Sequence, residues 1–509
     1  MEFNEAISPG EEKFERIRKT VGLFLGPAAF LFVFFLPFPS LSPVANRLAA
    51  ILLLVIIWWI TEPIPIPATA LLGSCMAVLF GIETAKKVLA PFADPVVFLF
   101  IGSFILAEAM SNHRLDRRIA YAILSLRGIG NNSRRILFVY GLIAVLISMW
   151  ISNTATTAML LPIGIGIINA ITHIYAEKTK KEVSAKSLKY STSLMLMAAY
   201  GASVGGLGTP VGTPPNLIGI GMISRLLNIK ISFFQWMLLA VPLVLVMYFV
   251  LFFLLSVLYP PEVKDIEGIN EFIKKKKEEL GPITPGERNV LIAFLITVML
   301  WVLPGLIAVI WGSASKIGSW YESRIPEAVA AIIGTTLLFL LPVDWSKRQF
   351  TISWPEAAKI DWGTIILFGG GLALGTLMFS TGLAEALGKW IFSFIGAKNN
   401  LSITATAIAV GIVISEITSN TASANMVIPV MISLAQAAGV NPLGPAIGAC
   451  LGASYGFMLP VSTPPNAIVY GSGMVPITKM VRTGIIFDLC GFVLILLVIM
   501  LYLPILGIK

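Results

Sequence analysis

Charged residues are scarce in this sequence. Of its 509 residues only 12% are Asp, Glu, Lys or Arg, against roughly 25% in soluble proteins, and 57% are hydrophobic. This composition excludes a soluble enzyme that carries a single membrane anchor. It predicts an all-α, polytopic protein whose partner is the lipid bilayer.

Cysteine and histidine are nearly absent as well. Cys75, Cys450 and Cys490 all lie in apolar stretches, where a cysteine acts as a small hydrophobic residue rather than as part of a disulfide or metal site. His113 and His173 each lie near the end of an apolar run, which favours the membrane interface over a proton relay. The apolar segments contain no Ser/His, His/Glu or Asp/Asp constellation for intramembrane hydrolysis, so we expect no enzyme activity.

The net charge of +9 would suit nucleic-acid binding, but the placement of the basic residues predicts no such partner. Six short segments hold 26 of the 36 Lys and Arg residues: 1–20, 113–135, 175–190, 259–288, 343–361 and 471–483. Because basic residues concentrate on the cytoplasmic side of membrane proteins, these segments are predicted to face inward. We therefore expect a multi-pass protein of the cell membrane, with a cytoplasmic N-terminus and an outer C-terminus.

Two polar strings interrupt the apolar sequence, and each occurs twice. Ser-Asn-Thr-Ala stands at 152–155 and 419–422, and Thr-Pro-Pro-Asn stands at 213–216 and 463–466. The two Ser-Asn-Thr-Ala strings are 267 residues apart, and Phe-x-Gly at residue 100 recurs 268 residues later. Matches in the same order at nearly one offset indicate an internal repeat rather than unrelated polar packing residues.

The first string lies inside the apolar stretch 136–174 and the second inside 403–438. Basic segments flank the first stretch on both sides, which suggests a re-entrant hairpin, although two full spans would give the same parity. We expect about 11 transmembrane helices plus two hairpins. Five spans and one hairpin in each half would invert the second copy, so the hairpins would enter from opposite faces, as in many transporters. A channel is disfavoured, because alternating access better explains two opposed hairpins.

This plan predicts four parts of the chain. They are an N-terminal leader with the first transmembrane helix (1–44), a first repeat (45–260) with an inward-entering hairpin (136–174), a cytoplasmic linker (261–288), and a second repeat (289–509) with an outward-entering hairpin (403–438).

The chemistry of the strings favours a site for cations and an anion. Oxygens of Ser, Thr and Asn, together with main-chain carbonyls freed at breaks, are hard, neutral ligands that suit Na⁺. Helix limbs that begin at Asn153 and Asn420 would direct their N-terminal dipoles inward and favour an anion. Ser148 and Ser415 each lie one helical turn before the string and could add a hydroxyl. Glu416 could serve either hairpin packing or direct cation binding.

Basic residues are missing from the motif segments. No Lys or Arg occurs between Arg135 and Lys178, between Lys189 and Arg225, or between Lys398 and Lys479. A multivalent anion at this site would depend on bound Na⁺ and helix dipoles to offset its charge. This dependence gives a physical reason for coupling anion to sodium.

The paired Ser-Asn-Thr strings, the paired Thr-Pro-Pro-Asn strings, the Trp-Trp-Ile-Thr-Glu string at 58–62 and the Phe-Gly-Gly-Gly string at 368–371 resemble the divalent anion:sodium symporter family. The resemblance covers residues 45–509. It implies a homodimer, with a scaffold domain and an elevator-like transport domain in each subunit.

The resemblance also implies a function and a set of site residues. The implied activity is sodium-coupled symport of C4-dicarboxylates of the succinate, malate and fumarate type, with Na⁺ as the coupling ion. Alternatives within the same fold are sodium-independent dicarboxylate exchange and transport of sulfate or another divalent anion. One sodium site would comprise Ser148, Ser152, Asn153 and Gly212, and the other Ser415, Ser419, Asn420 and Ser462. Substrate carboxylates would contact Asn153, Thr154, Asn420, Thr421, Thr463 and Pro464.

Overall fold

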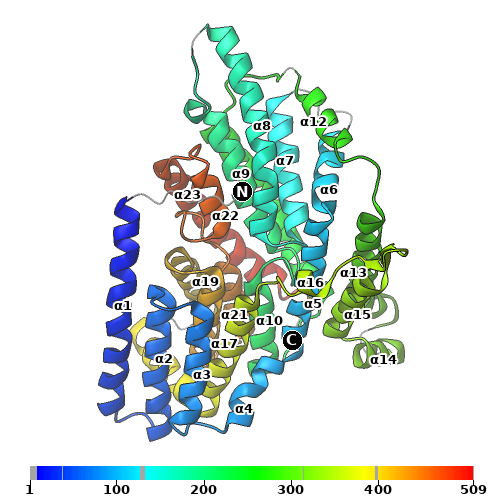
Figure 1. Ribbon diagram of the computed structural model, residues 1–509. Helices are drawn as coiled ribbons and strands as arrows, with labels where there is room; N and C mark the ends of the chain where they lie inside the picture. The colour runs from blue at the N-terminus through cyan, green and yellow to red at the C-terminus, as the bar shows by residue number, and fades with distance from the viewer. Residues whose placement is uncertain are drawn as a thin grey trace.

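The computed structural model describes residues 9–36, 38–126, 132–180, 182–266, 268–312, 315–395 and 399–507. The predicted all-α class is confirmed, since helices make up most of the described chain (Figure 1). The first half and the linker contain α1 (Pro9–Phe35), α2 (Pro43–Thr61), α3 (Ile66–Leu79), α4 (Ala85–Leu89), η1 (Ala90–Ala93), α5 (Pro95–Asn112), α6 (Leu115–Leu124), α7 (Ser133–Ser148), α8 (Asn153–Thr179), η2 (Ala185–Ser187), α9 (Lys189–Gly206), α10 (Pro214–Leu227), α11 (Phe233–Leu258) and α12 (Ile269–Glu278).

The second half is also mainly helical and has one short strand pair in addition. It contains α13 (Pro285–Trp311), α14 (Lys316–Arg324), α15 (Glu327–Leu340), β1 (Pro342–Asp344), β2 (Gln349–Phe350), α16 (Trp354–Ala357), α17 (Trp362–Ser380), α18 (Leu383–Ile395), α19 (Asn400–Ile417), α20 (Asn420–Ala437), α21 (Leu443–Gly452), α22 (Pro464–Gly471), α23 (Ile477–Leu497) and η3 (Val498–Tyr502). The two strands pair antiparallel.

Within the described ranges, nine helices are long and apolar enough to cross a membrane, or up to ten if α14 and α15, bent by 58° against each other, form one span. The sequence predicts two spans, 190–224 and 445–470, that are interrupted at 205–216 and 458–466, and the structure confirms both interruptions. The first stretch is α9, a loop and α10, and the second is α21, a loop and α22. Gly and Pro in these loops end the helices, because they lack helix-stabilising side chains or N–H groups.

Three other segments hold more helix than the sequence indicated. The charged leader is already helical from Pro9, so the first helix is longer than its apolar run. The basic segment 113–135 contains the amphipathic helix α6, and the linker contains α12. Such short helices escape a search for apolar runs because half of their surface is polar.

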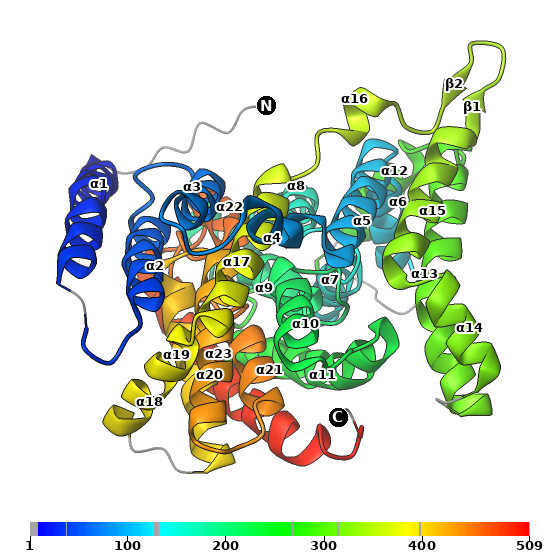
Figure 2. The same cartoon turned by 90° about the horizontal axis from the view of Figure 1, so that it is seen from below.

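The buried hydrophobic residues form two clusters. The smaller one joins α1, α2 and α3 to α17, and the larger one joins the helices from α5 to α13 to those from α17 to α23. Figure 2 shows α1, α2 and α3 on one side of the molecule and α13, α14 and α15 on the other, with the helices that carry the polar strings between them.

The two halves pack on each other reciprocally. α10, which follows the first Thr-Pro-Pro-Asn string, packs against α20 and α21 of the second half, and α22, which follows the second string, packs against α8 and α9 of the first half. Each helix that begins at a Thr-Pro-Pro-Asn string thus packs on the other half of the chain, as expected for two copies related by a pseudo-twofold axis.

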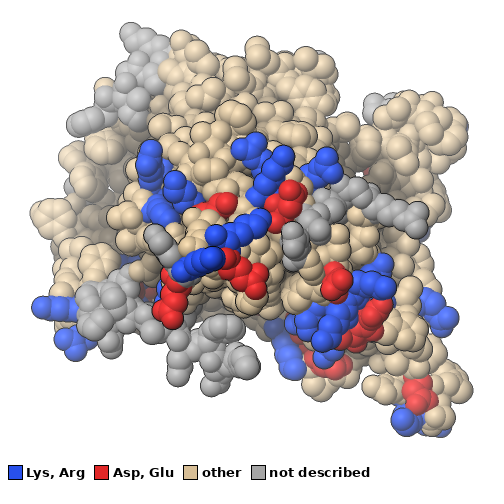
Figure 3. Space-filling model, turned by 90° about the horizontal axis from the view of Figure 1, so that it is seen from above, with Lys and Arg blue, Asp and Glu red and all other residues tan. Residues whose placement is uncertain are grey.

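Charged side chains gather at one end of the molecule. Figure 3 shows Lys and Arg, with Asp and Glu between them, over the end that is uppermost in Figure 1, where α12 and the end of α8 lie. This surface holds basic segments that the sequence predicts to be cytoplasmic.

Candidate functional site

The first Ser-Asn-Thr string forms the turn between α7 and α8. The hydroxyl of Ser148, the last residue of α7, donates a hydrogen bond to Oδ1 of Asn153, the first residue of α8, at 2.7 Å. Ser152 caps α8, since its side-chain oxygen accepts the N–H of Ala155 at 3.2 Å. The turn therefore ends one helix, starts the next and brings two side-chain oxygens into contact.

The second string builds the same turn between α19 and α20. Ser415 donates to Oδ1 of Asn420 at 2.7 Å, and Ser419 caps α20 by accepting the N–H of Ala422 at 3.3 Å. The Ser415 hydroxyl also lies 2.7 Å from the carbonyl oxygen of Ala453, beside the loop between α21 and α22. The Ser148–Asn153 and Ser415–Asn420 distances are equal, and so is the spacing of the two residues in each pair along the sequence.

The asparagine of each Thr-Pro-Pro-Asn string holds a broken loop in shape. Nδ2 of Asn216 donates to the carbonyls of Gly206, Leu207 and Thr209 at 2.9, 3.3 and 2.8 Å. Nδ2 of Asn466 donates to the carbonyls of Gly456 and Leu459, both at 3.0 Å. Both asparagines are fully buried, so each satisfies carbonyls that the interrupted helix would otherwise leave unpaired.

In the first half, this loop lies directly against the turn. A Cβ added at Gly206 would come within 2.4 Å of Oδ1 of Asn153, and one added at Gly212 within 2.5 Å of the Gly206 carbonyl oxygen. Ser148, Asn153 and Gly212, predicted together from the sequence, therefore form one cluster. Gly206 belongs to it too and was missed, because a glycine at a helix end resembles an ordinary breaker.

The second half forms the matching cluster. A Cβ added at Gly456 would lie 3.1 Å from Cβ of Ser462 and 3.3 Å from Oγ of Ser415. The structure thus brings Ser415, Asn420 and Ser462 together around Gly456, another residue that the sequence interpretation left out. Its only signal was its spacing to Asn466, which equals that of Gly206 to Asn216.

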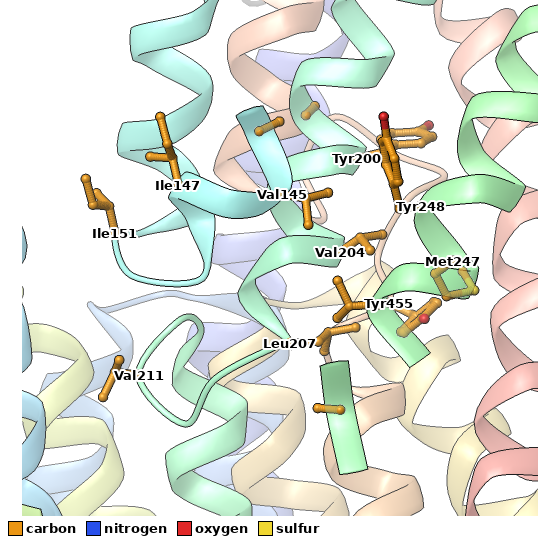
Figure 4. Packing of buried hydrophobic residues seen from close by; sticks show 14 of the residues in the cluster. Val145, Ile147, Ile151, Tyr200, Val204, Leu207, Val211, Met247, Tyr248 and Tyr455 are labelled. Carbon is orange, nitrogen blue, oxygen red and sulfur yellow. The ribbon is translucent and has the colours of Figure 1, made fainter. Parts of the chain in front are cut away.

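In both halves a hydrogen bond joins the broken loop to the hairpin turn. The loop contributes a side chain and the turn a backbone carbonyl in the first half, whereas the loop contributes a backbone N–H and the turn a side chain in the second. In the first half, the Thr209 hydroxyl donates to the Met149 carbonyl at 2.5 Å. The residue that corresponds to Met149 is Glu416, and its carboxylate accepts the N–H of Leu459, which corresponds to Thr209, at 3.3 Å. Figure 4 shows the first of these loops, which carries Val211, below the turn that carries Ile151.

Glu416 makes two further contacts that explain its burial. Its carboxylate accepts the N–H of Met458 at 2.8 Å and the hydroxyl of Ser462 at 2.5 Å. Of the two roles that the sequence left open, these contacts support packing of the hairpin against the loop.

The residues expected to contact substrate lie around the same turns. Asn153, Asn420 and Thr421 are half-buried, whereas Thr154 and Pro464 are exposed. Thr463 is buried, and its hydroxyl oxygen caps α22 by accepting the N–H of Asn466 at 3.4 Å. α22, which begins at Thr463 and Pro464, packs on α8, which begins at Asn153 and Thr154, and α10 packs on α20, which begins at Asn420 and Thr421.

Residues 18–509 match the family described as the sodium:sulfate symporter transmembrane region. The chain belongs to this family. It is 36% identical over 502 residues to the sodium-dependent dicarboxylate transporter SdcS of Staphylococcus saprophyticus, an alignment that covers 98% of this chain and 94% of that protein. The protein of the same name from Staphylococcus aureus (strain USA300) is 36% identical over 488 residues, which cover 95% of this chain and 91% of that protein.

Two solved structures resemble the fold of this family member. One is the YdaH transporter of Alcanivorax borkumensis, with 13% sequence identity, a TM-score of 0.53 and coverage of 89% of this chain and 98% of that one. The other is MtrF of Neisseria gonorrhoeae, with 13% sequence identity, a TM-score of 0.53 and coverage of 84% of each chain. At this identity the likeness concerns the arrangement of helices only.

Proposed function

We propose that this protein is a secondary active transporter that carries C4-dicarboxylates such as succinate, malate or fumarate together with Na⁺. The observation that carries the proposal is the pair of matched oxygen clusters, Ser148 with Asn153 and Ser415 with Asn420, in a chain whose relatives are named sodium-dependent dicarboxylate transporters.

Each cluster has the donors that Na⁺ requires. Side-chain oxygens of Ser148 and Asn153 lie 2.7 Å apart, and carbonyls of the neighbouring loop are held in place by Asn216. These oxygens are hard and neutral and come from a flexible mixture of backbone and side chain, which suits a monovalent ion with loose geometric demands. The first site would comprise Ser148, Ser152, Asn153 and Gly212, and the second would comprise Ser415, Ser419, Asn420 and Ser462. Ser152 and Ser419 also cap α8 and α20.

The anion would bind between the two sodium sites. Asn153, Thr154, Asn420 and Thr421 begin the helices α8 and α20, and Thr463 and Pro464 begin α22, so N–H groups and helix dipoles are available for carboxylates. Two sodium ions beside these helix starts would neutralise a dianion without any basic side chain.

The proposal extends to topology and mechanism. The α7–α8 and α19–α20 pairs would be re-entrant hairpins that enter an inverted repeat from opposite faces, with the N-terminus cytoplasmic and the C-terminus outside. A homodimer would hold a scaffold still while the hairpin-bearing domain moves as an elevator between the two faces. The reciprocal packing of α10 on α20 and α22 on α8 supports such a unit.

Uptake into proteoliposomes tests the function. Purified protein should accumulate labelled succinate when Na⁺ is higher outside, and collapse of the sodium gradient should abolish accumulation. Succinate exchange that proceeds equally without Na⁺ would instead favour the exchanger. Uptake of labelled sulfate that succinate does not inhibit would favour a sulfate carrier.

A further inference from the structure

A groove runs along the surface between α11 and α23. Its volume is about 420 Å³, and Cys490 of α23 lines it together with six apolar residues of α11: Phe249, Val250, Phe253, Leu254, Val257 and Leu258. Three of the α11 side chains, Phe249, Phe253 and Val257, are exposed. Both helices lie in segments that are long and apolar enough to cross a membrane. The groove therefore faces the hydrocarbon of the bilayer.

The groove is about as long as one leaflet of the bilayer is thick. From Phe249 to Leu258, α11 rises by about 13.5 Å at about 1.5 Å per residue. The hydrocarbon core of a bilayer is about 30 Å thick, so one leaflet contributes about 15 Å. Leu258 is the last residue of α11, and the linker that follows it is predicted to be cytoplasmic. The groove is thus predicted to lie in the cytoplasmic leaflet, with Leu258 at the headgroup end.

A basic side chain lies at this end of the groove. The hydroxyl of Tyr259, the residue after α11, donates to the carbonyl of Lys479 at 3.2 Å and lies 2.9 Å from the hydroxyl of Thr483. Arg482 lies between these two residues in α23, so it is at the same level. Arg482 is exposed, and in the part of the chain that the structure describes no Asp or Glu pairs with it. Its guanidinium is therefore available to an anion.

The arginine is aligned with the groove. Arg482, Ile486 and Cys490 are four residues apart in α23, and side chains at this spacing form one row along a helix. Arg482 precedes Cys490 by about 12 Å along the helix axis. Lys479, about one turn before Arg482, is already engaged, since it lies 5.6 Å from the centroid of the Tyr259 ring and donates to Thr192. The row thus joins a free cation at the end of the groove to the apolar surface inside it.

The residues of the groove favour a hydrocarbon chain over another helix. Helices that pack on each other in a membrane use small residues, which let their backbones approach closely. The six α11 residues of the groove are Phe, Leu and Val, with no Gly, Ala, Ser or Thr among them. A flexible acyl chain adapts to such large side chains, and the guanidinium at the end selects a negatively charged headgroup.

We propose that this groove binds one acyl chain of an anionic phospholipid whose phosphate pairs with Arg482. A guanidinium offers two parallel N–H donors to phosphate oxygens. The cytoplasmic leaflet carries anionic lipids, and basic residues near its surface attract them. This inference goes beyond the transport function and depends neither on the substrate nor on sodium.

Native mass spectrometry of the purified full chain tests the site. Protein in detergent is titrated with phosphatidylglycerol and with phosphatidylcholine of the same acyl chains, without sodium or dicarboxylate. We expect the first phosphatidylglycerol per chain to bind more tightly than phosphatidylcholine. Arg482→Gln should weaken phosphatidylglycerol binding about fivefold, which corresponds to the roughly 1 kcal/mol that one basic residue contributes near an anionic lipid surface. Phosphatidylcholine binding should stay unchanged in this variant. Leu254→Trp, which places an indole in the groove, should weaken the binding of both lipids.

Matched variants control for effects elsewhere on the surface. Arg134→Gln removes an exposed arginine in the first turn of α7, and Leu295→Trp adds an indole at an exposed position of α13. Both should bind phosphatidylglycerol like the wild-type protein. If Leu254→Trp fails to fold, Val257→Trp replaces it, because Val257 lines the groove and is 60% exposed.

Other results decide against the lipid site. Equal affinity of the wild-type protein for both lipids overturns it, and so does an equal loss of phosphatidylglycerol binding in the control variants. Unchanged phosphatidylglycerol binding in Arg482→Gln removes the headgroup contact, and unchanged binding in the tryptophan variant removes the groove, so either result overturns the inference. If the tryptophan variant changes the oligomeric state while lipid binding stays the same, the groove is a contact with a second copy of the chain instead. Succinate uptake is measured separately, so failure of the lipid site leaves the proposed function untouched.

Discussion

The hydroxyl of Ser148 donates a hydrogen bond to Oδ1 of Asn153 at 2.7 Å, and Ser415 and Asn420 reproduce this contact at the same distance in the second half. Each pair closes the turn of a helical hairpin while presenting two oxygens toward a loop held by a buried asparagine. The same atoms therefore serve the fold and the proposed ion site, so variants must separate the two roles.

The first prediction concerns these asparagines. Asn153→Ala and Asn420→Ala should each lower sodium-driven succinate uptake by at least about 100-fold, because each removes a ligand proposed for both ion and substrate. Helix caps at Ser152 and Ser419 remain, so both variants should elute from size-exclusion chromatography like the wild-type protein. Wild-type uptake by either variant would show that the site has been placed wrongly.

A second prediction tests the glycines that the sequence interpretation missed. Gly206→Ala places a methyl group 2.4 Å from Oδ1 of Asn153 and should weaken sodium binding strongly without unfolding the protein. The control is Gly471→Ala at the end of α22, where a Cβ would meet nothing within 4 Å. Sodium-dependent protection against thermal unfolding should fall in the first variant alone. Equal protection in both variants would remove Gly206 from the site.

Much of this arrangement could be predicted from the sequence, for reasons that particular residues make clear. The strings at 152–155 and 419–422 predict helix starts because Ser followed by a helical run is a cap, and the structure places both caps there. The repeat offset predicted that Ser148 and Ser415 would take equivalent positions, and the equal distances confirm this prediction.

The rest depended on contacts between distant segments. The hydrogen bond from the Leu459 N–H to the Glu416 carboxylate corresponds to the one from the Thr209 hydroxyl to the Met149 carbonyl. Because a side chain in one half takes the place of the backbone in the other, a comparison of residue types cannot reveal the correspondence. Asp488 lies outside every repeated string, and α23, which carries it, packs through Gly484 on Met458, whose N–H the Glu416 carboxylate accepts. Local patterns determine helix starts, whereas tertiary packing determines which loop meets which turn.

A third prediction addresses stability at the linker. The guanidinium of Arg118 on α6 contacts both carboxylate oxygens of Glu287 at 2.7 and 3.1 Å and the carbonyl of Gly281 at 3.0 Å. Glu287 is 3% exposed, so Arg118→Met leaves a buried charge unpaired and should destabilise the protein by about 3–5 kcal/mol. Thermal unfolding in detergent measures this effect, with the exposed Arg117→Met as control. Equal melting of the two variants would refute it.

A fourth prediction concerns the opposed hairpins. Ser184 and Asn399 are both exposed. Ser184 follows α8, the second helix of the first hairpin, and Asn399 precedes α19, the first helix of the second hairpin. In a background without the three native cysteines, Ser184→Cys should react with an impermeant maleimide only from the cytoplasm and Asn399→Cys only from outside. Labelling of both from one face would contradict the inverted topology.

The last prediction joins ion to substrate. The elements that begin at the two turns bring helix dipoles but no basic side chain to a dianion. A Na⁺ ion 4 Å from a carboxylate contributes about 4 kcal/mol at an effective dielectric constant of about 20. Sodium should therefore strengthen succinate binding by up to about three orders of magnitude, and succinate should tighten sodium binding by the same factor, because the coupling free energy is shared. Potassium should fail to substitute, since short Ser and Asn side chains form too small a site. Calorimetric titration of succinate at several sodium concentrations, with choline keeping ionic strength constant, measures the coupling. An affinity that stays the same from zero to saturating sodium would exclude the symporter and favour the exchanger.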